Sequence, residues 1–217
     1  MKTTVIMVRH GQSVANAENR FAGHSDFELT DVGREQATLA AKFYSKELHP
    51  DVIYSSDLKR AHNTALPFAD IYRLPINDRE GLREIYAGKW EGLPVARIAE
   101  LYTDDLLTWQ NDFSHARCTD GESVRELYFR IVNEVLTLIK SNPSKTLLIT
   151  THATPIRAIQ AYSSGLGAER INEIKFVRNS SLNIFEYNFE NEKMSCVKTD
   201  ITDHLDGSLI TCLPKSL

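Results

Sequence analysis

The chain has 217 residues, of which 42% are hydrophobic and 25% charged, as is typical of a globular protein with one substantial core. The formal net charge of −4 argues against binding nucleic acid or anionic membranes, so an anionic ligand requires a local cluster of cations. The sequence shows no signal peptide and no apolar run long enough to span a membrane. These features predict a cytoplasmic protein with a single domain over residues 1–217, and they leave the oligomeric state open.

The first predicted element is a buried strand at residues 5–8, which is followed directly by Arg9, His10 and Gly11. A short continuous apolar run is typical of a strand that is covered on both faces. Open α/β sheets bind their ligands at the carboxyl ends of the strands. A cation, an imidazole and a glycine at that point supply an anion clamp, a nucleophile and close backbone approach, which a phosphate monoester site requires.

Beyond this strand, short apolar runs alternate with segments of helical periodicity. Strands are predicted at residues 51–54, 75–77, 146–151, 175–177, 181–187 and 194–198. Helices are predicted between Thr30 and Pro50, over residues 57–72 and 96–109, between Ser123 and Asn142, and after His152. This alternation predicts an α/β protein, a three-layer α/β/α sandwich with a mostly parallel central sheet.

Several predicted helix ends carry local signals. Thr30 is placed as an N-cap, and Asp57 lies close to the start of the next helix. Ser123 and Glu126 have the spacing of a capping box. Pro155 suits the first turn of the helix after His152.

Two segments interrupt the alternation. Residues 12–29 are polar and are interpreted as a loop over the end of the first strand. Residues 85–120 are irregular and are interpreted as a cap-like excursion that roofs the strand ends. Trp90 and Trp109 within it fit either a cavity wall or ordinary aromatic packing.

Three of the predicted strands end at groups that can bind phosphate. The first ends at Arg9 and His10, the second at residues 55–56 with Arg60 one turn into the next helix, and the third at His152. If these strands are parallel neighbours, the groups converge at one edge of the sheet. Two guanidiniums there can hold phosphate oxygens and neutralise charge during phosphoryl transfer. A histidine between them can attack phosphorus and form a covalent intermediate.

A carboxylic acid would complete this chemistry by protonating the departing alcohol and then activating water. Glu84 is the candidate for this role. On residue type alone, Glu80 and Glu91 are equally available.

Further motifs follow the first one in a fixed order. They are Arg9-His10-Gly11, Asn16, residues 21–23, residues 29–33, residues 55–61, residues 64–65, Leu82-Arg83-Glu84, residues 88–92, residues 121–123 and Thr151-His152. In this order they resemble the histidine phosphatase superfamily from residue 5 to about residue 157. Residues 203–205 are similar to a tail found in many phosphatase members of that family.

The resemblance implies a metal-independent phosphatase that hydrolyses small phosphate monoesters through a phosphohistidine intermediate. It implies His10 as the nucleophile and Glu84 as the proton donor. The residues that it implies for phosphate binding are Arg9, Asn16, Gly23, Arg60 and His152. It implies no metal and no organic cofactor.

The chain departs from the family pattern at three positions. Ala153 follows the second histidine where glycine is usual, and because alanine resists positive φ, the local geometry comes into question. Ala15 stands where phosphoglycerate mutases carry tryptophan. Ile85 stands where mutases carry the arginine that holds the substrate carboxylate. The last two departures favour the phosphatase branch.

Three alternatives stay open at this stage. One is a cofactor-dependent phosphoglycerate mutase, and another is a phospho-ligand binding protein without turnover, which Ala153 suggests. The third is metal ligation by His10, Glu84 and His152, which the nearby arginines disfavour by repulsion. Sugar phosphates, α-ribazole phosphate, phosphoglycerates and phosphoproteins all remain possible substrates.

Some potential site residues are expected to play no part. His62 is expected to lie on the surface, and His24, His49 and His115 are expected to be loop residues. Glu122 could touch substrate, but it also suits a helix N-terminus and is left out of the site. The cysteines Cys118, Cys196 and Cys212 are widely separated, lack metal-binding spacing and are typical of inert thiols in a reducing compartment.

Overall fold

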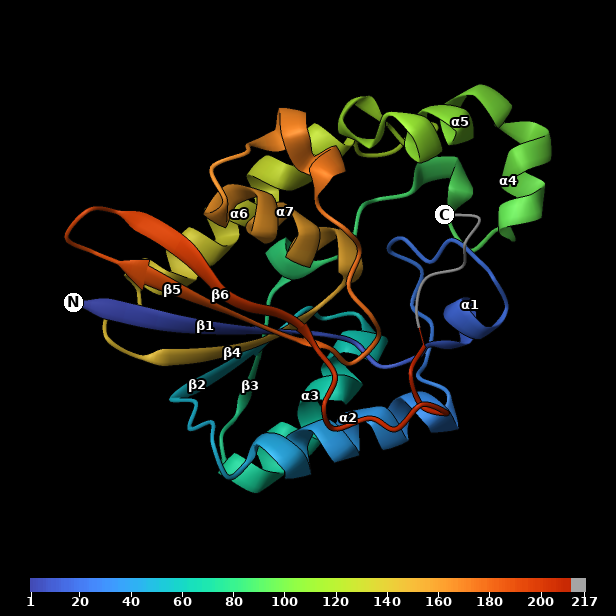
Figure 1. Cartoon of the computed structure of the whole chain (residues 1–217). Coiled ribbons are helices and arrows are strands. Elements are labelled where there is room, and N and C mark those ends of the chain that lie inside the picture. Colours follow the sequence, from blue (N-terminus) through green and yellow to red (C-terminus); the bar gives the residue numbers. More distant parts are fainter. Residues whose placement is uncertain (212–217) are drawn as a thin grey trace.

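A six-stranded sheet forms the centre of the computed structural model, which describes residues 1–211 (Figure 1). The strands are β1 (Lys2–Arg9), β2 (Val52–Ser55), β3 (Ile76–Asp78), β4 (Thr146–Thr151), β5 (Leu182–Asn188) and β6 (Lys193–Ile201). Their order is β3-β2-β4-β1-β5-β6. The first four run parallel, and β5 and β6 add an antiparallel hairpin at one edge. The predicted α/β class with a mostly parallel sheet is confirmed.

Helices cover both faces of this sheet. The α-helices of the described residues are α1 (Val14–Ala17), α2 (Asp31–Tyr44), α3 (Lys59–Tyr72), α4 (Val95–Leu101), α5 (Thr103–Asn111), α6 (Val124–Lys140) and α7 (Ala153–Ser163), and four of them form these covering layers. Figure 1 shows α2 and α3 on one face and α6 and α7 on the other, which makes three layers. Helices α4 and α5 lie to one side of the layers.

The alternation of side chains along β1 divides the core into two clusters. Val5 and Met7 pack with residues of α6 and α7, whereas Ile6 and Val8 pack with residues of α2 and α3. All four side chains are fully buried. The apolar run that predicted this strand is therefore explained by cover on both faces.

The helix-capping signals in the sequence are confirmed. The Thr30 hydroxyl accepts a hydrogen bond from the Gly33 N–H at the start of α2. Ser123 and Glu126 form both bonds of the capping box of α6. Pro155 lies in the first turn of α7, as its missing N–H allows.

Other predicted boundaries are wrong. The helix predicted from residue 57 begins at Lys59, with Leu58 as its N-cap, and the Asp57 carboxylate accepts hydrogen bonds from Arg83. The helix predicted over residues 96–109 is two helices, which are separated by the non-helical backbone of Tyr102. The loop predicted at residues 12–29 contains the short helix α1.

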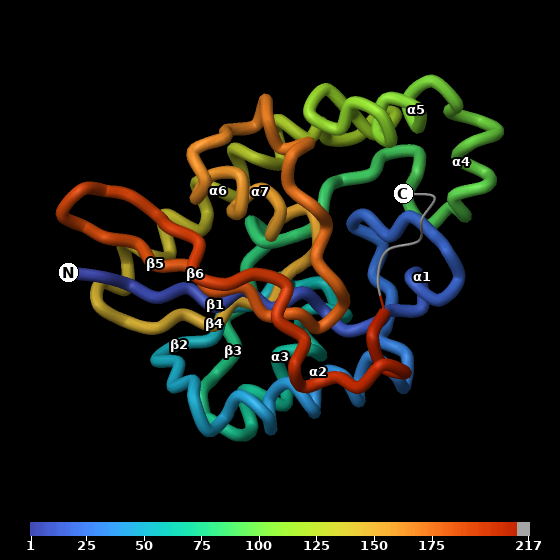
Figure 2. The backbone as a smooth tube through the Cα atoms, viewed as in Figure 1, coloured from blue at the N-terminus to red at the C-terminus, as the bar shows by residue number. Residues whose placement is uncertain are grey.

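Residues 175–177 are not a strand, contrary to the prediction. The carbonyl of Val177 accepts a hydrogen bond from Arg9 Nη1 instead of joining a sheet ladder. The tube in Figure 2 shows this stretch descending from the α7 side toward the end of β1. The segment therefore lies beside the carboxyl end of β1.

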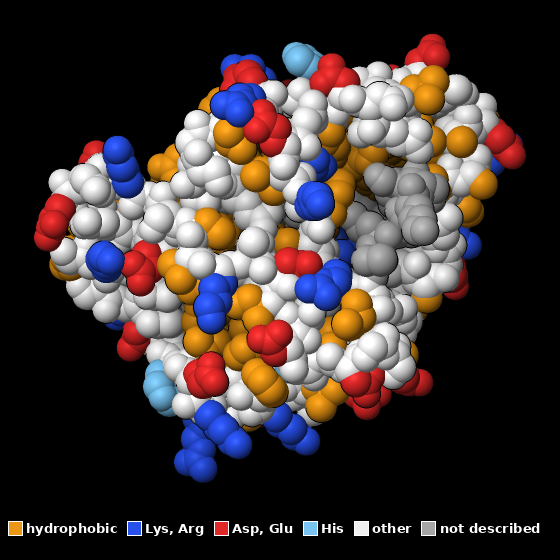
Figure 3. Space-filling model, viewed as in Figure 1, with side chains coloured by type: hydrophobic (Ala, Val, Ile, Leu, Met, Phe, Trp, Pro, Cys, Tyr) orange, Lys and Arg blue, Asp and Glu red, His pale blue; other side chains and the backbone are white. Residues whose placement is uncertain are grey.

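The remaining features of the described residues concern the cysteines, helix hydrophobicity and the charges on the surface. Cys118 is buried and Cys196 exposed, both unpaired, and Cys212 lies outside the described residues. Within residues 1–211, no helix has the length and apolar character needed to cross a membrane. On the face drawn in Figure 3, acidic and basic side chains are interspersed.

Candidate active site

The strand ends that were expected to converge do so. Arg9 at the end of β1 lies opposite Thr151 at the end of β4, and the His10 N–H donates to the Thr151 carbonyl at 2.9 Å. On the other side of β4, the Ser56 N–H donates to the Thr150 carbonyl, also at 2.9 Å. Because β2, β4 and β1 are parallel neighbours, their carboxyl ends open into one space.

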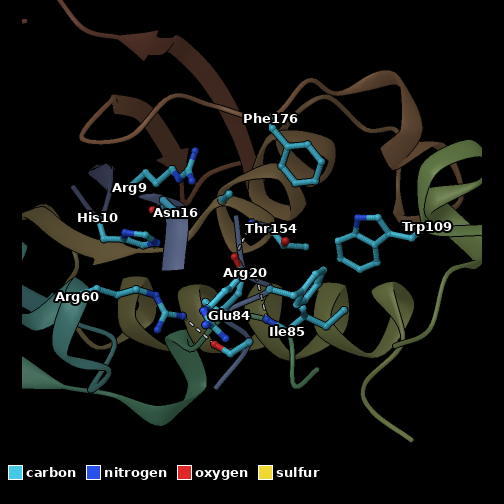
Figure 4. Close-up of a pocket in the computed structure, with 14 residues that line it drawn as sticks. Arg9, His10, Asn16, Arg20, Arg60, Glu84, Ile85, Trp109, Thr154 and Phe176 are labelled. Carbon is cyan, nitrogen blue, oxygen red and sulfur yellow. Dashed lines mark hydrogen bonds between the residues drawn. The ribbon is translucent and has the colours of Figure 1, made fainter. Parts of the chain in front are cut away.

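That space is a cavity with about 530 Å³ of empty volume, part of it open to solvent. The residues that line it are Arg9, His10, Asn16, Arg20, Phe21, Ala22, Gly23, Arg60, Glu84, Ile85, Trp109, Ala153, Thr154 and Phe176. Figure 4 shows Arg9, His10 and Arg60 on one side, with Trp109 and Phe176 farther along. Six of the seven predicted site residues therefore line one cavity. The seventh, His152, is fully buried behind them, with its ring centroid 5.2 Å from that of His10.

His10 is held in the form that a nucleophile requires. Its Nδ1 lies 2.7 Å from the Gly11 carbonyl oxygen. Because a carbonyl only accepts, Nδ1 carries the proton, and Nε2 keeps its lone pair. Burial, followed by the positive charges of Arg60 and Arg9, holds the pKa of His10 well below its usual value. The imidazole is therefore neutral at physiological pH.

We expect His10 in the folded protein to stay uncharged at about pH 6, whereas in the urea-unfolded chain it titrates near 6.5. The folded state binds this proton less tightly, so below about pH 6.5 the unfolded chain holds more protons and the free energy of unfolding falls. Imidazole ¹⁵N NMR, assigned with the His10→Ala spectrum, measures the charge state directly. A protonated His10 in the folded protein at that pH would contradict this assignment.

Two buried arginines flank His10, and backbone carbonyls fix both. Arg9 Nη1 donates to the Val177 carbonyl at 2.6 Å. Arg60, in the first turn of α3, donates from Nη1 to the Ser25 carbonyl at 2.8 Å and from Nη2 to the Gly23 carbonyl at 2.7 Å. Burial lowers the pKa of Arg60 to about 10, which still leaves it charged at neutral pH.

The loop that holds Arg60 is itself held by Glu91. The Glu91 carboxylate accepts from the N–H groups of His24 at 2.7 Å and Ser25 at 2.6 Å, and from the N–H of Ala87 at 2.8 Å. Gly23 has φ of +51°, and a Cβ there would lie 2.2 Å from the Glu91 carboxylate. Only glycine fits this loop without displacing Glu91.

Asn16 presents an amide nitrogen to the cavity. Its Oδ1 accepts from the Ser13 N–H at 3.0 Å, from the Ser13 hydroxyl at 3.1 Å and from Asn179 Nδ2 at 3.2 Å. With the oxygen occupied, Nδ2 is the end that is free to donate to an anion. Asn179 also donates to the His10 carbonyl at 3.1 Å, so it ties these two site residues together.

Glu84 lies across the cavity from His10, near the start of α7. Its Oε1 accepts from the Ile85 N–H at 2.9 Å, and its Oε2 accepts weakly from the Thr154 N–H at 3.3 Å. Ala153 is the first residue of α7 and is absent from the described residues with positive φ. Alanine is therefore compatible with the local backbone. The N-terminus of α7 directs N–H groups and a positive dipole at the cavity.

His152 has one bound nitrogen and one without a partner. Its Nε2 lies 2.9 Å from the Ser56 hydroxyl, and its buried Nδ1 has no hydrogen-bond partner within the described residues. Burial and the charge of Arg60 lower its pKa well below the usual value, so the ring is neutral. Within residues 1–211, no group of three or more His, Cys, Asp or Glu side chains is arranged to hold a metal ion.

The loop that carries Glu84 is fastened by Arg130 of α6. Arg130 donates to the carbonyls of Gly81 and Arg83 at 3.0 Å and to that of Glu84 at 3.1 Å. Its remaining donors pair with both carboxylate oxygens of Glu122 at 2.8 Å. One side chain thus fixes the backbone on both sides of Arg83.

Replacing Arg130 with methionine is expected to lower the free energy of unfolding by about 2–4 kcal/mol, because three carbonyls and a carboxylate lose a charged donor. Urea unfolding measures the change. Arg125→Met is the matched control on the same helix, since its pair with Glu169 is exposed and its loss costs below about 0.5 kcal/mol. Equal losses of unfolding free energy in the two variants would show that the hydrogen bonds of Arg130 stabilise the protein no more than an exposed ion pair does.

Sequence reasoning missed several residues around the cavity. Asn179, Arg130 and Phe176 carried no recognisable signal, because they come from segments far from the motifs. His24 lies in a loop as expected, but its Nε2 donates to the Glu84 carbonyl at 2.9 Å. Trp109 lines the cavity, whereas Trp90 is fully buried in the core.

Comparison with known proteins agrees with this geometry. Residues 5–200 match the model of the histidine phosphatase superfamily, branch 1. The chain therefore belongs to the histidine phosphatase superfamily, as its motifs predicted.

Two relatives and one solved structure illustrate the family. Phosphoserine phosphatase 1 of Hydrogenobacter thermophilus is 32% identical over 202 residues, which cover 93% of each chain. The metal-independent phosphoserine phosphatase of Arabidopsis thaliana is 33% identical over 172 residues, covering 75% of this chain and 71% of the relative. A mycobacterial glucosyl-3-phosphoglycerate phosphatase has a similar structure, with a TM-score of 0.81, 28% identity, and coverage of 91% of this chain and 98% of that one.

Proposed function

We propose that this protein is a metal-independent phosphatase that hydrolyses small phosphate monoesters through a phosphohistidine at His10. The observation that carries the proposal is the neutral His10 imidazole, with Nδ1 bound to the Gly11 carbonyl and two buried arginines beside it. Its relatives include proteins named as phosphatases for phosphoserine and glucosyl-3-phosphoglycerate. A cytoplasmic location stays a prediction.

The first step is attack of His10 Nε2 on phosphorus. Arg9 and Arg60 hold the phosphate oxygens as charge develops on them. Asn16 Nδ2 and the N–H of Gly23 are further donors for these oxygens, whereas His152 lies behind His10 and does not line the cavity. The bond from phosphorus to the ester oxygen breaks while the bond from Nε2 to phosphorus forms.

Glu84 supplies the proton that the departing oxygen takes up, because its carboxyl group lines the same cavity as the nucleophile. It then takes a proton from the water that attacks the phosphohistidine. Inorganic phosphate leaves, and His10 returns to its starting form. Ile85 and Trp109 form the cavity wall on the side of residues 85–120, which supports a cap role for that segment.

The mutase alternative is disfavoured by the residue next to the acid. Ile85 is a fully buried apolar side chain that lines the cavity, so it offers no charge to a substrate carboxylate. A binding protein without turnover has the same pocket, and only measured turnover separates it from a phosphatase.

Phosphate release from a panel of monoesters, in EDTA and beside His10→Ala, tests the proposal. Release that depends on His10 and persists in EDTA is the expected result. The panel includes 3-phosphoglycerate with a 2,3-bisphosphoglycerate primer, and isomerisation there would reassign the protein as a mutase. Activity that collapses in EDTA and returns with zinc or magnesium would overturn the metal-independent mechanism. Phosphate binding without turnover would leave a binding protein.

A further inference from the structure

A second cavity adjoins the first and has a strongly basic, amide-rich lining. Its polar residues are Gln110, Asn111, Arg157, Asn172 and Lys175. Among the residues of 1–211 that line it, none is an aspartate or glutamate. Two cations and three amides with no acid describe a place for an anion rather than for a neutral ligand.

Arg157 is the unusual member of this lining. It is only 7% exposed, on α7, and the central carbon of its guanidinium lies 4.1 Å from the centroid of the Phe113 ring and 4.3 Å from that of the Phe176 ring. The two rings are tilted by 81° with centroids 5.5 Å apart, so they lie on adjacent sides of the guanidinium, and a ligand reaches its N–H donors on the sides that the rings leave open.

Those donors are almost unused. Nη2 donates to the Asn172 carbonyl at a long 3.4 Å, and Nε has no partner within residues 1–211. No ion pair to Arg157 occurs in that part of the chain, and burial lowers its pKa to about 10 with no acid to offset it. Burying a cation without a counter-charge costs free energy. That cost is offset when a bound ligand supplies the negative charge.

The two cavities share a wall. Trp109 and Phe176 line both of them. In Figure 4 both rings stand on the side of the cavity away from His10. A substrate that is held by its phosphate at His10 and passes these rings therefore points its far end toward Arg157.

We propose that the second cavity binds a second anionic group of the substrate through Arg157 and Lys175. The inference rests on the proposed phosphatase function and narrows its substrates to phosphate monoesters that carry an acid several atoms from the ester. A carboxylate and a second phosphate share the chemistry that the guanidinium edge recognises.

Three esters of one carbon skeleton test this: sorbitol 6-phosphate, 6-phosphogluconate and sorbitol 1,6-bisphosphate. They end in a hydroxyl, a carboxylate and a phosphate respectively. We expect at least one acidic ester to exceed the neutral one in kcat/KM by about tenfold, the effect of a charged hydrogen bond. The preferred acid identifies the source of the anion.

Arg157→Gln is expected to bring this acid-to-neutral ratio close to one, and Lys175→Gln, at an exposed position, to lower it by about threefold. Arg157→Lys, which keeps the charge, should retain part of the ratio if glutamine impairs folding. Arg170→Gln is the matched control, because it removes a nearby surface cation that does not line the cavity. It is expected to leave the ratio unchanged.

An acid-to-neutral ratio of kcat/KM near one in the wild type would overturn the inference. So would a ratio that is unchanged by Arg157→Gln and by Lys175→Gln. So would turnover of p-nitrophenyl phosphate with none of the six-carbon esters. Calorimetric binding of the same esters to His10→Ala protein keeps the two proposals distinguishable. If no ester is hydrolysed, the phosphatase fails, and the binding preference still decides the role of the second cavity.

Discussion

His10→Ala is expected to lower kcat by at least about 1,000-fold on every phosphate monoester that the wild type hydrolyses. The reason is that the variant loses the Nε2 lone pair, and no other histidine is among the residues of 1–211 that line the cavity. His152 cannot replace it, because it is fully buried and does not line the cavity. Stopped assays of phosphate release measure the loss.

The covalent intermediate provides a second, independent readout. Acid-labile phosphate should be trapped on the wild-type protein during turnover and be absent from His10→Ala. His115→Ala, at an exposed position outside the cavity, is the matched control and should trap phosphate like the wild type. Trapped phosphate on the His10→Ala protein would place the nucleophile elsewhere.

Glu84→Gln is expected to separate substrates by their leaving groups. An alkyl alcohol departs poorly without a proton, so kcat/KM for an alkyl phosphate, which reports phosphoryl transfer to His10, should fall by about 100-fold. p-Nitrophenolate departs readily as an anion, so kcat/KM for its ester should fall by less than about fivefold, although the later hydrolysis of the phosphohistidine slows equally for both esters. Glutamine keeps the size of the side chain, which limits disturbance of the Arg130 contacts.

The decisive measurement is the loss on the alkyl ester relative to the loss on the nitrophenyl ester in Glu84→Gln. Equal losses on alkyl and nitrophenyl esters would remove Glu84 from the role of general acid. Glu80→Gln is the matched control, because this carboxylate is exposed, does not line the cavity, and was indistinguishable from Glu84 by residue type. It is expected to affect both esters by less than about twofold.

Much of the fold follows from local patterns in the sequence. The apolar run at residues 5–8 indicated a strand covered on both faces, and Thr30 and Ser123 marked helix starts that the structure confirms. The motifs, in their order along the chain, were sufficient to identify the family. They contain the residue types that phosphoryl transfer requires at the ends of several strands.

Where local signals failed, a long-range contact had displaced a local preference. The helix predicted from residue 57 begins two residues later, because the Asp57 carboxylate binds Arg83. Residues 175–177 had the composition of a strand, but the Val177 carbonyl binds Arg9.

The sequence by itself determined the α/β class, the order of the strands and helices along the chain, and the identity of the groups at the strand ends. These depend on periodicity and residue type, which are local properties. Only the tertiary structure decided that β1, β4 and β2 are neighbours, that His10 is desolvated beside two arginines, and that Arg157 lies buried with no ion pair to any acid among residues 1–211. Burial and charge pairing depend on residues far apart in the chain, so they emerge only when the layers pack.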